Sequence, residues 1–252
     1  MEFVDTHCHP HFSDFKDKAE EILANARAAS VNKMIAVGVN LEDSRKAIEF
    51  AAAHENIWAS VGTHPHDAKE FNGQAGELGK LLKNPKVVAY GEIGLDYYKL
   101  YSDKADQKAV LRQQINIGLA SGLPFIFHVR DAWDDFFEIF DNYKDIKGVV
   151  HSFSATPAEL DEILSRNLYV GLNGIMTFTK DDAQLEAAKK VPLNRLLLET
   201  DAPYLSPAPR RGKTCEPSFL VDTAKFLADL RSESLEELAA ATTKNARELF
   251  SI

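Results

Sequence analysis

Short apolar runs alternate along the chain with longer stretches in which apolar residues recur at helical spacing. The runs are rich in Val, Ile, Leu and Phe, which is typical of parallel strands buried on both faces. They predict eight strands, at residues 3–5, 33–39, 57–61, 87–91, 124–128, 148–151, 168–171 and 195–199.

The stretches between the predicted strands are typical of amphipathic helices. Leu111, Ile115 and Leu119 recur every four residues and form one apolar face. Ser102 before this face and Gly122 after it are plausible start and stop residues. Two further helices are predicted to begin with a capping box, formed by Thr156 with Glu159 and by Ser234 with Glu237.

Strands that alternate with helices suit either a closed barrel or an open doubly wound sheet. Polar residues able to do chemistry follow the carboxyl ends of several predicted strands. In a barrel these ends converge on one mouth, whereas in an open sheet they spread along an edge. We therefore predict an α/β protein, a (β/α)8 TIM barrel, and its 252 residues fit a single domain covering 1–252.

Composition indicates the cellular compartment of the protein more clearly than its function. The net charge of −9 argues against broad electrostatic coating of nucleic acid, but metal ions and a local basic rim could still serve a nucleic-acid enzyme. Cys8 and Cys215 are the two cysteines and lie far apart, so no disulfide framework is expected. Without a basic leader segment or an apolar run of about 20 residues, we expect a cytoplasmic protein with no membrane contact.

Three residues near strand ends are candidate metal ligands. His7 and His9 are two apart, so on an extended strand both imidazoles point the same way and could reach one ion. Two surface histidines near a turn are the plainer interpretation of that pair. Glu92 follows an apolar run and is bracketed by glycines. Because a lone buried charge is costly, its partner should be an arginine or a metal ion.

Three more candidates follow later strands. His128 and His151 each come directly after buried apolar residues, where a single histidine is more often a hydrogen-bonded core residue. Asp201 follows the last strand, where it could bind a metal and accept a proton from water, or merely cap the next turn. Taken together, four histidines and two carboxylates at one mouth favour two divalent ions with open coordination positions.

The motifs around these residues resemble the TatD family of metal-dependent deoxyribonucleases, in the amidohydrolase-like TIM-barrel superfamily. The matching segments, in order between residues 5 and 217, are DTHCH at 5–9, GTHPH at 62–66, GEIGLD at 91–96, HVRDA at 128–132, HSFS at 151–154 and ETDAPYL at 199–205. The resemblance implies that His7, His9 and Asp201 hold one metal ion. It implies that His128 and His151 hold a second ion and that Glu92 bridges the two.

The same resemblance implies hydrolysis of DNA phosphodiester bonds, as a 3′–5′ exonuclease, by water that two divalent ions (Mg²⁺, Mn²⁺ or Zn²⁺) activate. Glu92 and Asp201 would be the catalytic residues, with Asp201 accepting the proton. The substrate-binding candidates are His64, His66, Arg130, Arg210, Arg211 and Lys213. Tyr97, Tyr98 and Tyr204 could stack on bases, although packing is the simpler role for each.

One departure from the family pattern and two other functions remain open. Cys215 stands where the family usually has an asparagine, which affects substrate detail more than metal binding. The same metal site could instead hydrolyse a small amide, lactone or phosphotriester, because one fold hosts many chemistries. A metal-stabilised binding protein without turnover is a third possibility. For the leading hypothesis we expect DNA as substrate and a monomer with no obligate protein partner.

Overall fold

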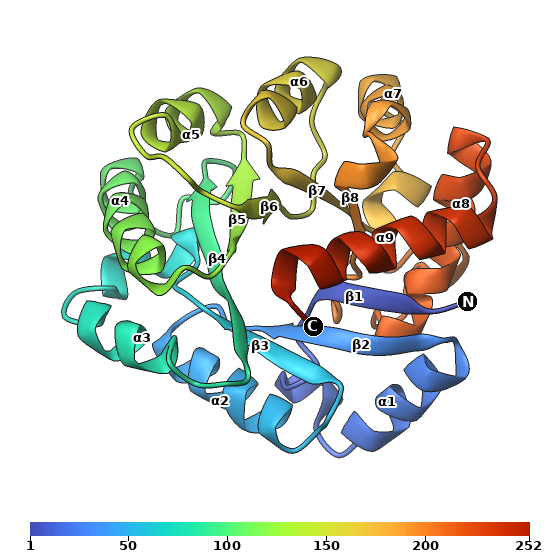
Figure 1. The fold of residues 1–252 in the computed structure, drawn as a ribbon, viewed down its shortest axis with the longest axis horizontal. Helices are drawn as coiled ribbons and strands as arrows, with labels where there is room; N and C mark the ends of the chain where they lie inside the picture. Colours follow the sequence, from blue (N-terminus) through green and yellow to red (C-terminus); the bar gives the residue numbers. More distant parts are fainter. The chain divides into compact units, whose positions relative to one another are not determined.

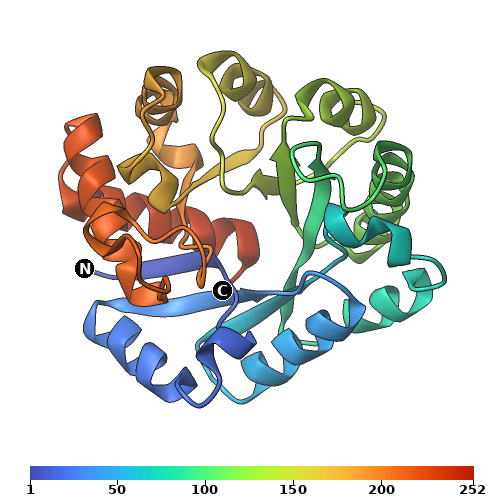
Figure 2. The same cartoon turned by 180° about the vertical axis from the view of Figure 1, so that it is seen from behind.

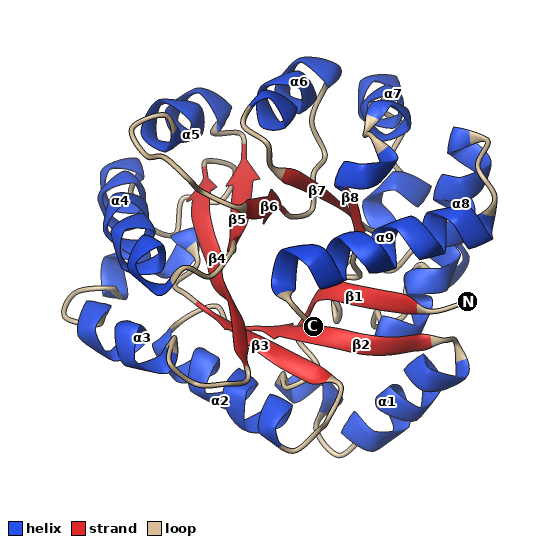
Figure 3. Ribbon diagram, in the orientation of Figure 1, coloured by secondary structure: helices blue, strands red, loops and turns tan.

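The computed structural model describes residues 1–252 and contains eight strands and nine α-helices (Figures 1 and 3). The strands are β1 Phe3–Cys8, β2 Val31–Val37, β3 Ile57–Val61, β4 Val87–Asp96, β5 Phe125–Arg130, β6 Gly148–Val150, β7 Tyr169–Leu172 and β8 Leu196–Leu198. The helices are α1 Ala19–Ala28, α2 Leu41–Ala52, α3 Ala75–Leu81, α4 Lys104–Ser121, α5 Trp133–Phe140, α6 Pro157–Ser165, α7 Asp182–Lys190, α8 Leu220–Arg231 and α9 Leu235–Phe250.

All eight strands belong to one sheet, and the order of strands across it is the order along the chain. The chain divides into two compact units, one formed by 1–35 with 151–252 and the other by 36–150. Most strand residues are buried, which agrees with the near-continuous apolar runs in the sequence.

The unit formed by 36–150 contains β3, β4, β5 and β6, which pair in parallel. The longest strand, β4, pairs with β5 along its C-terminal half, where Gly94 lies opposite His128 and Asp96 opposite Arg130. Helices α4 and α5 pack against β4 and β5 from outside (Figure 1). This register brings the polar ends of two strands to the same level.

The other unit contains β1, β7 and β8, and its C-terminal helix α9 packs against β1 and β8 (Figure 2). Two polar side chains of α9 secure this packing. Thr243 Oγ1 donates to the Glu2 carbonyl at 2.8 Å, and Asn245 Nδ2 donates to the Leu196 carbonyl at 2.8 Å. Strand β1 is tied to β8 in turn, because Thr6 Oγ1 donates to the Leu198 carbonyl at 3.0 Å.

The predicted strands are all present, and the differences concern their ends. Residues 57–61 form β3 as predicted, whereas β4 continues five residues beyond the predicted end to Asp96 and therefore includes Glu92. Helix α4 is preceded by Asp103 rather than Ser102 and ends at Gly122, whose φ of 71° lies in the left-handed region. Ser102 instead donates to the His66 carbonyl at 2.7 Å.

Two other expectations are also met. Both predicted capping boxes are formed, at the starts of α6 and α9. Both cysteines are free and buried, as expected for a chain without a disulfide framework. None of the helices is long and apolar enough to cross a membrane.

Candidate metal centre

The first ligand cluster lies in the unit formed by 1–35 with 151–252 and consists of His7, His9 and Asp201. Asp201 Oδ1 lies 3.6 Å from His7 Nε2 and 3.4 Å from His9 Nε2. Both histidines are buried. Three potential ligand atoms lie within 4.8 Å of one another. The alternation of side chains along β1 explains why both imidazoles reach the same carboxylate.

Backbone hydrogen bonds hold this cluster in place. The Asp201 N–H donates to the His7 carbonyl at 2.8 Å, and the His9 N–H donates to the Ala202 carbonyl at 2.7 Å. Asp201 itself has a φ of 59°, in the left-handed region that aspartate tolerates better than most residues. The segment after β8 is therefore fixed directly to β1, which sets the spacing between the three side chains.

A further buried carboxylate, Asp5, is not among the predicted site residues but supports the same cluster. Asp5 accepts hydrogen bonds from Thr200 Oγ1 at 2.6 Å, from Thr200 N–H at 3.0 Å and from His7 N–H at 3.3 Å. Burial nevertheless raises the pKa of Asp5 from its ordinary value to about 7, because these hydrogen bonds offset only part of the cost of desolvation. Asp5 is thus a structural link between β1 and the segment after β8.

His151 belongs to the same unit and stacks on His7. Their ring centroids are 3.9 Å apart, and the ring planes are inclined by 13°. Glu199 lies beside His151, with Oε1 at 3.4 Å from Nδ1, and is fully buried. Glu199 Oε1 also accepts from Ser152 N–H at 2.6 Å and Asn173 Nδ2 at 3.3 Å. Glu199 lies in the ETDAPYL segment at 199–205, and its position in the sequence alone predicts no role for it.

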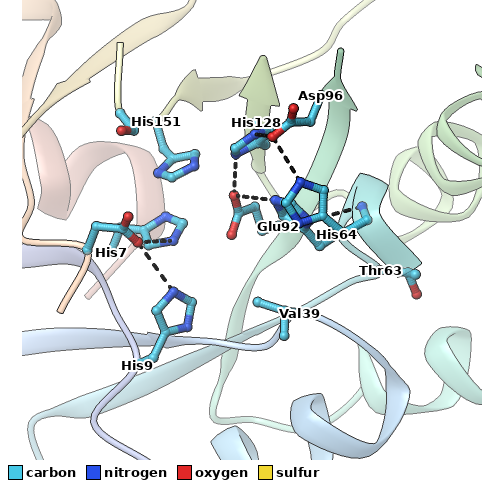
Figure 4. Close-up of polar contacts among 12 residues, drawn as sticks. His7, His9, Val39, Thr63, His64, Glu92, Asp96, His128 and His151 are labelled. Carbon is cyan, nitrogen blue, oxygen red and sulfur yellow. Dashed lines mark hydrogen bonds and ion pairs between the residues drawn. The ribbon is translucent and has the colours of Figure 1, made fainter. Parts of the chain in front are cut away.

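The second cluster lies in the unit formed by 36–150 and consists of His64, Glu92 and His128. Glu92 Oε1 lies 2.7 Å from His128 Nδ1 and 3.5 Å from His64 Nε2, as the dashed lines in Figure 4 mark. Again three potential ligand atoms lie within 4.8 Å of one another. The sequence predicts His64 as a substrate-binding residue, and its contact with Glu92 adds it to the candidate ligands.

Asp96 supports the second cluster through a contact with His128. Its Oδ2 lies 3.2 Å from His128 Nε2 and 3.0 Å from His66 Nε2, and its Oδ1 accepts from Lys99 N–H at 2.7 Å. Burial opposes ionisation, but the hydrogen bonds from His128 and His66 outweigh it and hold the pKa of Asp96 well below its usual range. A carboxylate on the far nitrogen of a histidine is the usual way to orient a metal-binding imidazole.

Two glycines allow β4 to carry Glu92 in this position. A Cβ at Gly94 would lie 1.8 Å from the His128 carbonyl oxygen, and one at Gly91 would lie 2.4 Å from the Ile126 carbonyl oxygen. Both residues also have positive φ, 157° at Gly91 and 154° at Gly94. Strand β5 therefore approaches β4 too closely for any side chain at these positions.

The donor sets fit divalent metal ions. Ligands at about 2.0–2.2 Å from a tetrahedral ion lie about 3.3–3.6 Å from one another, and the contacts of Asp201 with His9 and His7 are 3.4 and 3.6 Å. Burial raises the pKa of Asp201, but the hydrogen bond from His9 and the charges of His7 and His151 outweigh it and lower the pKa. Asp201 is therefore an ionised carboxylate, as a metal ligand must be.

The comparisons with known proteins agree with this chemistry. The family model for TatD related DNase matches residues 4–251. A metal-dependent hydrolase of Bacillus subtilis, YabD, is 36% identical, with 98% of each chain covered. The 3′–5′ ssDNA/RNA exonuclease TatD of Cronobacter sakazakii is 39% identical, with 94% of each chain covered. The chain belongs to the TatD family.

Solved structures of TatD proteins have the same fold. The Escherichia coli TatD homologue YJJV superposes with a TM-score of 0.94 at 29% identity, covering 99% of this chain and 98% of its own. A TatD-family hydrolase from Entamoeba histolytica superposes with a TM-score of 0.91 at 26% identity, covering 99% and 98%. The predicted (β/α)8 TIM barrel is thereby confirmed, and this TatD-family chain is a metal-dependent hydrolase.

The predicted substrate-binding residues of this TatD-family hydrolase differ in whether their side chains already contact other groups of the protein. Arg130 is exposed, and its guanidinium lies 3.9 Å from the centre of the Tyr98 ring. Arg210 Nε is bound to Asp222 Oδ2 at 2.9 Å, and Arg211 donates to the Ser206 carbonyl at 3.0 Å. Lys213 is exposed. Of the three arginines, Arg130 is thus the one next to the second cluster, two residues beyond His128.

Proposed function

We propose that this TatD-family hydrolase is a nuclease that cleaves phosphodiester bonds of single-stranded DNA from the 3′ end, with two divalent metal ions as cofactors. The observation that carries the proposal is the pair of buried or partly buried clusters, His7–His9–Asp201 and His64–Glu92–His128, each with three ligand atoms within 4.8 Å. The name of the Cronobacter sakazakii relative, a 3′–5′ ssDNA/RNA exonuclease, supports the substrate class and direction.

In this proposal His7, His9 and Asp201 would hold one ion, and His128 and His151 would hold the other. Glu92 would be a ligand of both ions. His64, which lies 3.5 Å from Glu92, is an additional candidate ligand of the second ion. When bound, a pair of divalent ions lowers the pKa of water and neutralises charge on the phosphate oxygens.

The side chains of the protein supply the remaining chemistry. Asp201 is ionised, because its pKa lies below the usual value, so it can accept the proton of the attacking water. Asp96 keeps a proton on His128 Nε2 and so directs Nδ1 towards Glu92. Arg130 offers a planar set of donors suited to phosphate oxygens. Further phosphates of the DNA strand would be contacted by Arg211 and Lys213. Arg210 would join them once its ion pair with Asp222 opens.

The test is a metal-supplemented assay on end-labelled single-stranded and double-stranded DNA. We expect ladder-like shortening of the single strand from its 3′ end with Mg²⁺, Mn²⁺ or Zn²⁺, and none in excess chelator. Asp201→Ala should lower kcat by about 10²–10⁴-fold, the usual contribution of a group that transfers a proton in the transition state. Glu92→Ala, which removes a proposed ligand of both ions, should also lose most of the activity. Glu162→Ala, on the exposed face of α6, is the control and should keep wild-type activity.

The same protein should be offered a panel of small esters, lactones, amides and phosphotriesters. If it leaves every DNA and RNA strand intact with each metal but turns over one of these compounds, the nuclease proposal is refuted and the small-molecule hydrolase replaces it. If the two alanine variants cleave DNA as fast as the wild type, the proposed metal centre is refuted even though the substrate class stands.

A further inference from the structure

Large apolar side chains are exposed together on the loop between β4 and α4. Tyr98, Leu100 and Tyr101 are 57%, 55% and 59% exposed, and only Met1 and Tyr204 are comparable elsewhere among large apolar side chains. Single exposed apolar residues are ordinary, but a group of them beside a candidate active site indicates a surface that another molecule covers. Three of the five such side chains therefore occupy one seven-residue loop.

This loop is held firmly by its other residues. Tyr97 donates its phenol hydrogen to Asp135 Oδ2 at 2.5 Å, and its N–H donates to the Arg130 carbonyl at 2.9 Å. Lys104 Nζ lies over the Tyr97 ring at 4.0 Å. Tyr97 is thus the anchor of the loop. A fixed loop presents its exposed rings at little entropic cost, as a binding surface requires.

Contacts connect the exposed rings to the second ligand cluster. The Tyr101 ring packs edge-on against the His66 ring, with centroids 4.8 Å apart. His66 contacts Asp96 at 3.0 Å, and Asp96 contacts His128 at 3.2 Å. Tyr98 lies against the Arg130 guanidinium at 3.9 Å, and Arg130 is two residues beyond His128 on β5. We call Tyr98, Tyr101 and Arg130 the aromatic platform.

We propose that the aromatic platform binds the unpaired bases of a single nucleic-acid strand next to the scissile phosphate; the inference rests on the proposed nuclease function and adds how the strand is held. Aromatic rings beside cations are the usual means of holding single strands, since bases stack on the rings and phosphates pair with the cations. Arg130, Lys99 and Lys104 supply local positive charge on a chain whose net charge is −9. In a duplex the base faces are already stacked, so the aromatic platform selects single strands.

The experiment measures binding and turnover separately. Fluorescence anisotropy of a labelled single-stranded oligonucleotide reports binding to metal-free protein, and steady-state kinetics with the added metal give KM and kcat. Stacking contributes about 1–3 kcal/mol per base, so Tyr98→Ala and Tyr101→Ala should each weaken binding and raise KM by about 5- to 150-fold. Because neither ring touches the reacting atoms, kcat should change much less than KM.

Two controls separate stacking from folding. Tyr98→Phe keeps the ring and should recover most of the affinity lost in Tyr98→Ala. Tyr169→Ala removes a ring that also lies beneath an arginine, Arg195 at 4.9 Å, but at the opposite, N-terminal end of a strand. It should bind and cleave as the wild type does. A further control changes the substrate. An oligonucleotide of abasic residues should bind weakly to the wild type, and Tyr98→Ala should weaken this binding only slightly further.

Three outcomes overturn the aromatic platform. In the first, both alanine variants bind the strand with wild-type affinity. In the second, Tyr98→Phe loses as much affinity as Tyr98→Ala. In the third, Tyr98→Ala loses as much affinity for the abasic strand as for the normal strand. If the protein cleaves DNA but shows any of these, the platform fails while the nuclease function stands. If wild-type protein neither binds nor cleaves any strand, the nuclease function fails, and the exposed rings serve another partner.

Discussion

Replacing Asp96 with asparagine tests whether this carboxylate sets the proton position on His128. Asp96 Oδ2 faces His128 Nε2 at 3.2 Å and His66 Nε2 at 3.0 Å, while Oδ1 accepts from Lys99 N–H at 2.7 Å. An imidazole that donates from Nε2 has its lone pair on Nδ1, which is the nitrogen 2.7 Å from Glu92. The carboxylate therefore keeps Nδ1 available as a metal ligand.

Asparagine has the same shape but only one acceptor. Its oxygen should remain on the Lys99 N–H, so its amide nitrogen turns towards His128 and His66 and must donate there. His128 Nε2 then has to accept, and the ring proton moves to Nδ1, where it blocks coordination. Removal of such an orienting partner typically costs 10–100-fold in metal affinity, which is about 1.4–2.7 kcal/mol.

The assay is competition for Zn²⁺ or Mn²⁺ with a chromophoric chelator, which resolves two binding events in the wild type if the proposed centre is correct. In Asp96→Asn we expect one event to weaken by about 10–100-fold and the other to stay close to the wild type. Asp135→Asn is the matched control, because Asp135 also accepts a short hydrogen bond, from Tyr97 at 2.5 Å, but contacts none of the clustered histidines. Wild-type affinity for both ions in Asp96→Asn would refute the tautomer argument, and equal weakening of both would indicate a folding defect instead.

Two predictions concern stability. Burial raises the pKa of Asp5 from 3.8 to about 7, so between these values the folded metal-free protein keeps a proton that the unfolded chain has lost. The free energy of unfolding should therefore fall as the pH rises from about 4 to about 7, by at most about 4 kcal/mol. Urea melts at several pH values should show this decrease in the wild type and not in Asp5→Asn. An equal decrease in both proteins would contradict the prediction. Gly94→Ala, whose Cβ would lie 1.8 Å from the His128 oxygen, should cost more than about 3 kcal/mol in the same melts. Gly73→Ala, with a φ of 78° but no atom within 4 Å, should cost only about 1–2 kcal/mol, and similar losses at the two glycines would contradict the steric argument.

The sequence predicted the strands well because buried parallel strands carry a strong local pattern. The run 57–61 is almost entirely apolar and forms β3 without change. The predicted strand ends at residue 91, five residues before the end of β4. Glycines such as those at 91 and 94 are typical of a strand end or bulge. In the structure they instead mark a close approach of β5, which no local pattern indicates.

The supporting carboxylates could not be predicted for a related reason. Glu199 accepts a hydrogen bond from Ser152, which is 47 residues away in the sequence, and Asp96 contacts His128, which is 32 residues away. Such contacts depend on burial and register, which a single sequence does not give. The neighbouring tyrosines make the same point, because Tyr97 is anchored and Tyr98 is 57% exposed although both follow the same strand.

The spacing of the β4 motif follows from the geometry of the second cluster. Side chains two apart on a strand share a face, so Glu92, position 94 and Asp96 all face His128 on the neighbouring strand. Glu92 meets Nδ1 of that ring and Asp96 meets Nε2, and the position between them lies against the His128 backbone. A carboxylate, a glycine and a second carboxylate at alternate positions therefore place one carboxylate oxygen beside each nitrogen of a single imidazole. A chain that lost the second carboxylate while keeping the first would need another acceptor for Nε2, and His66 and Tyr101 would lose their link to the cluster with it.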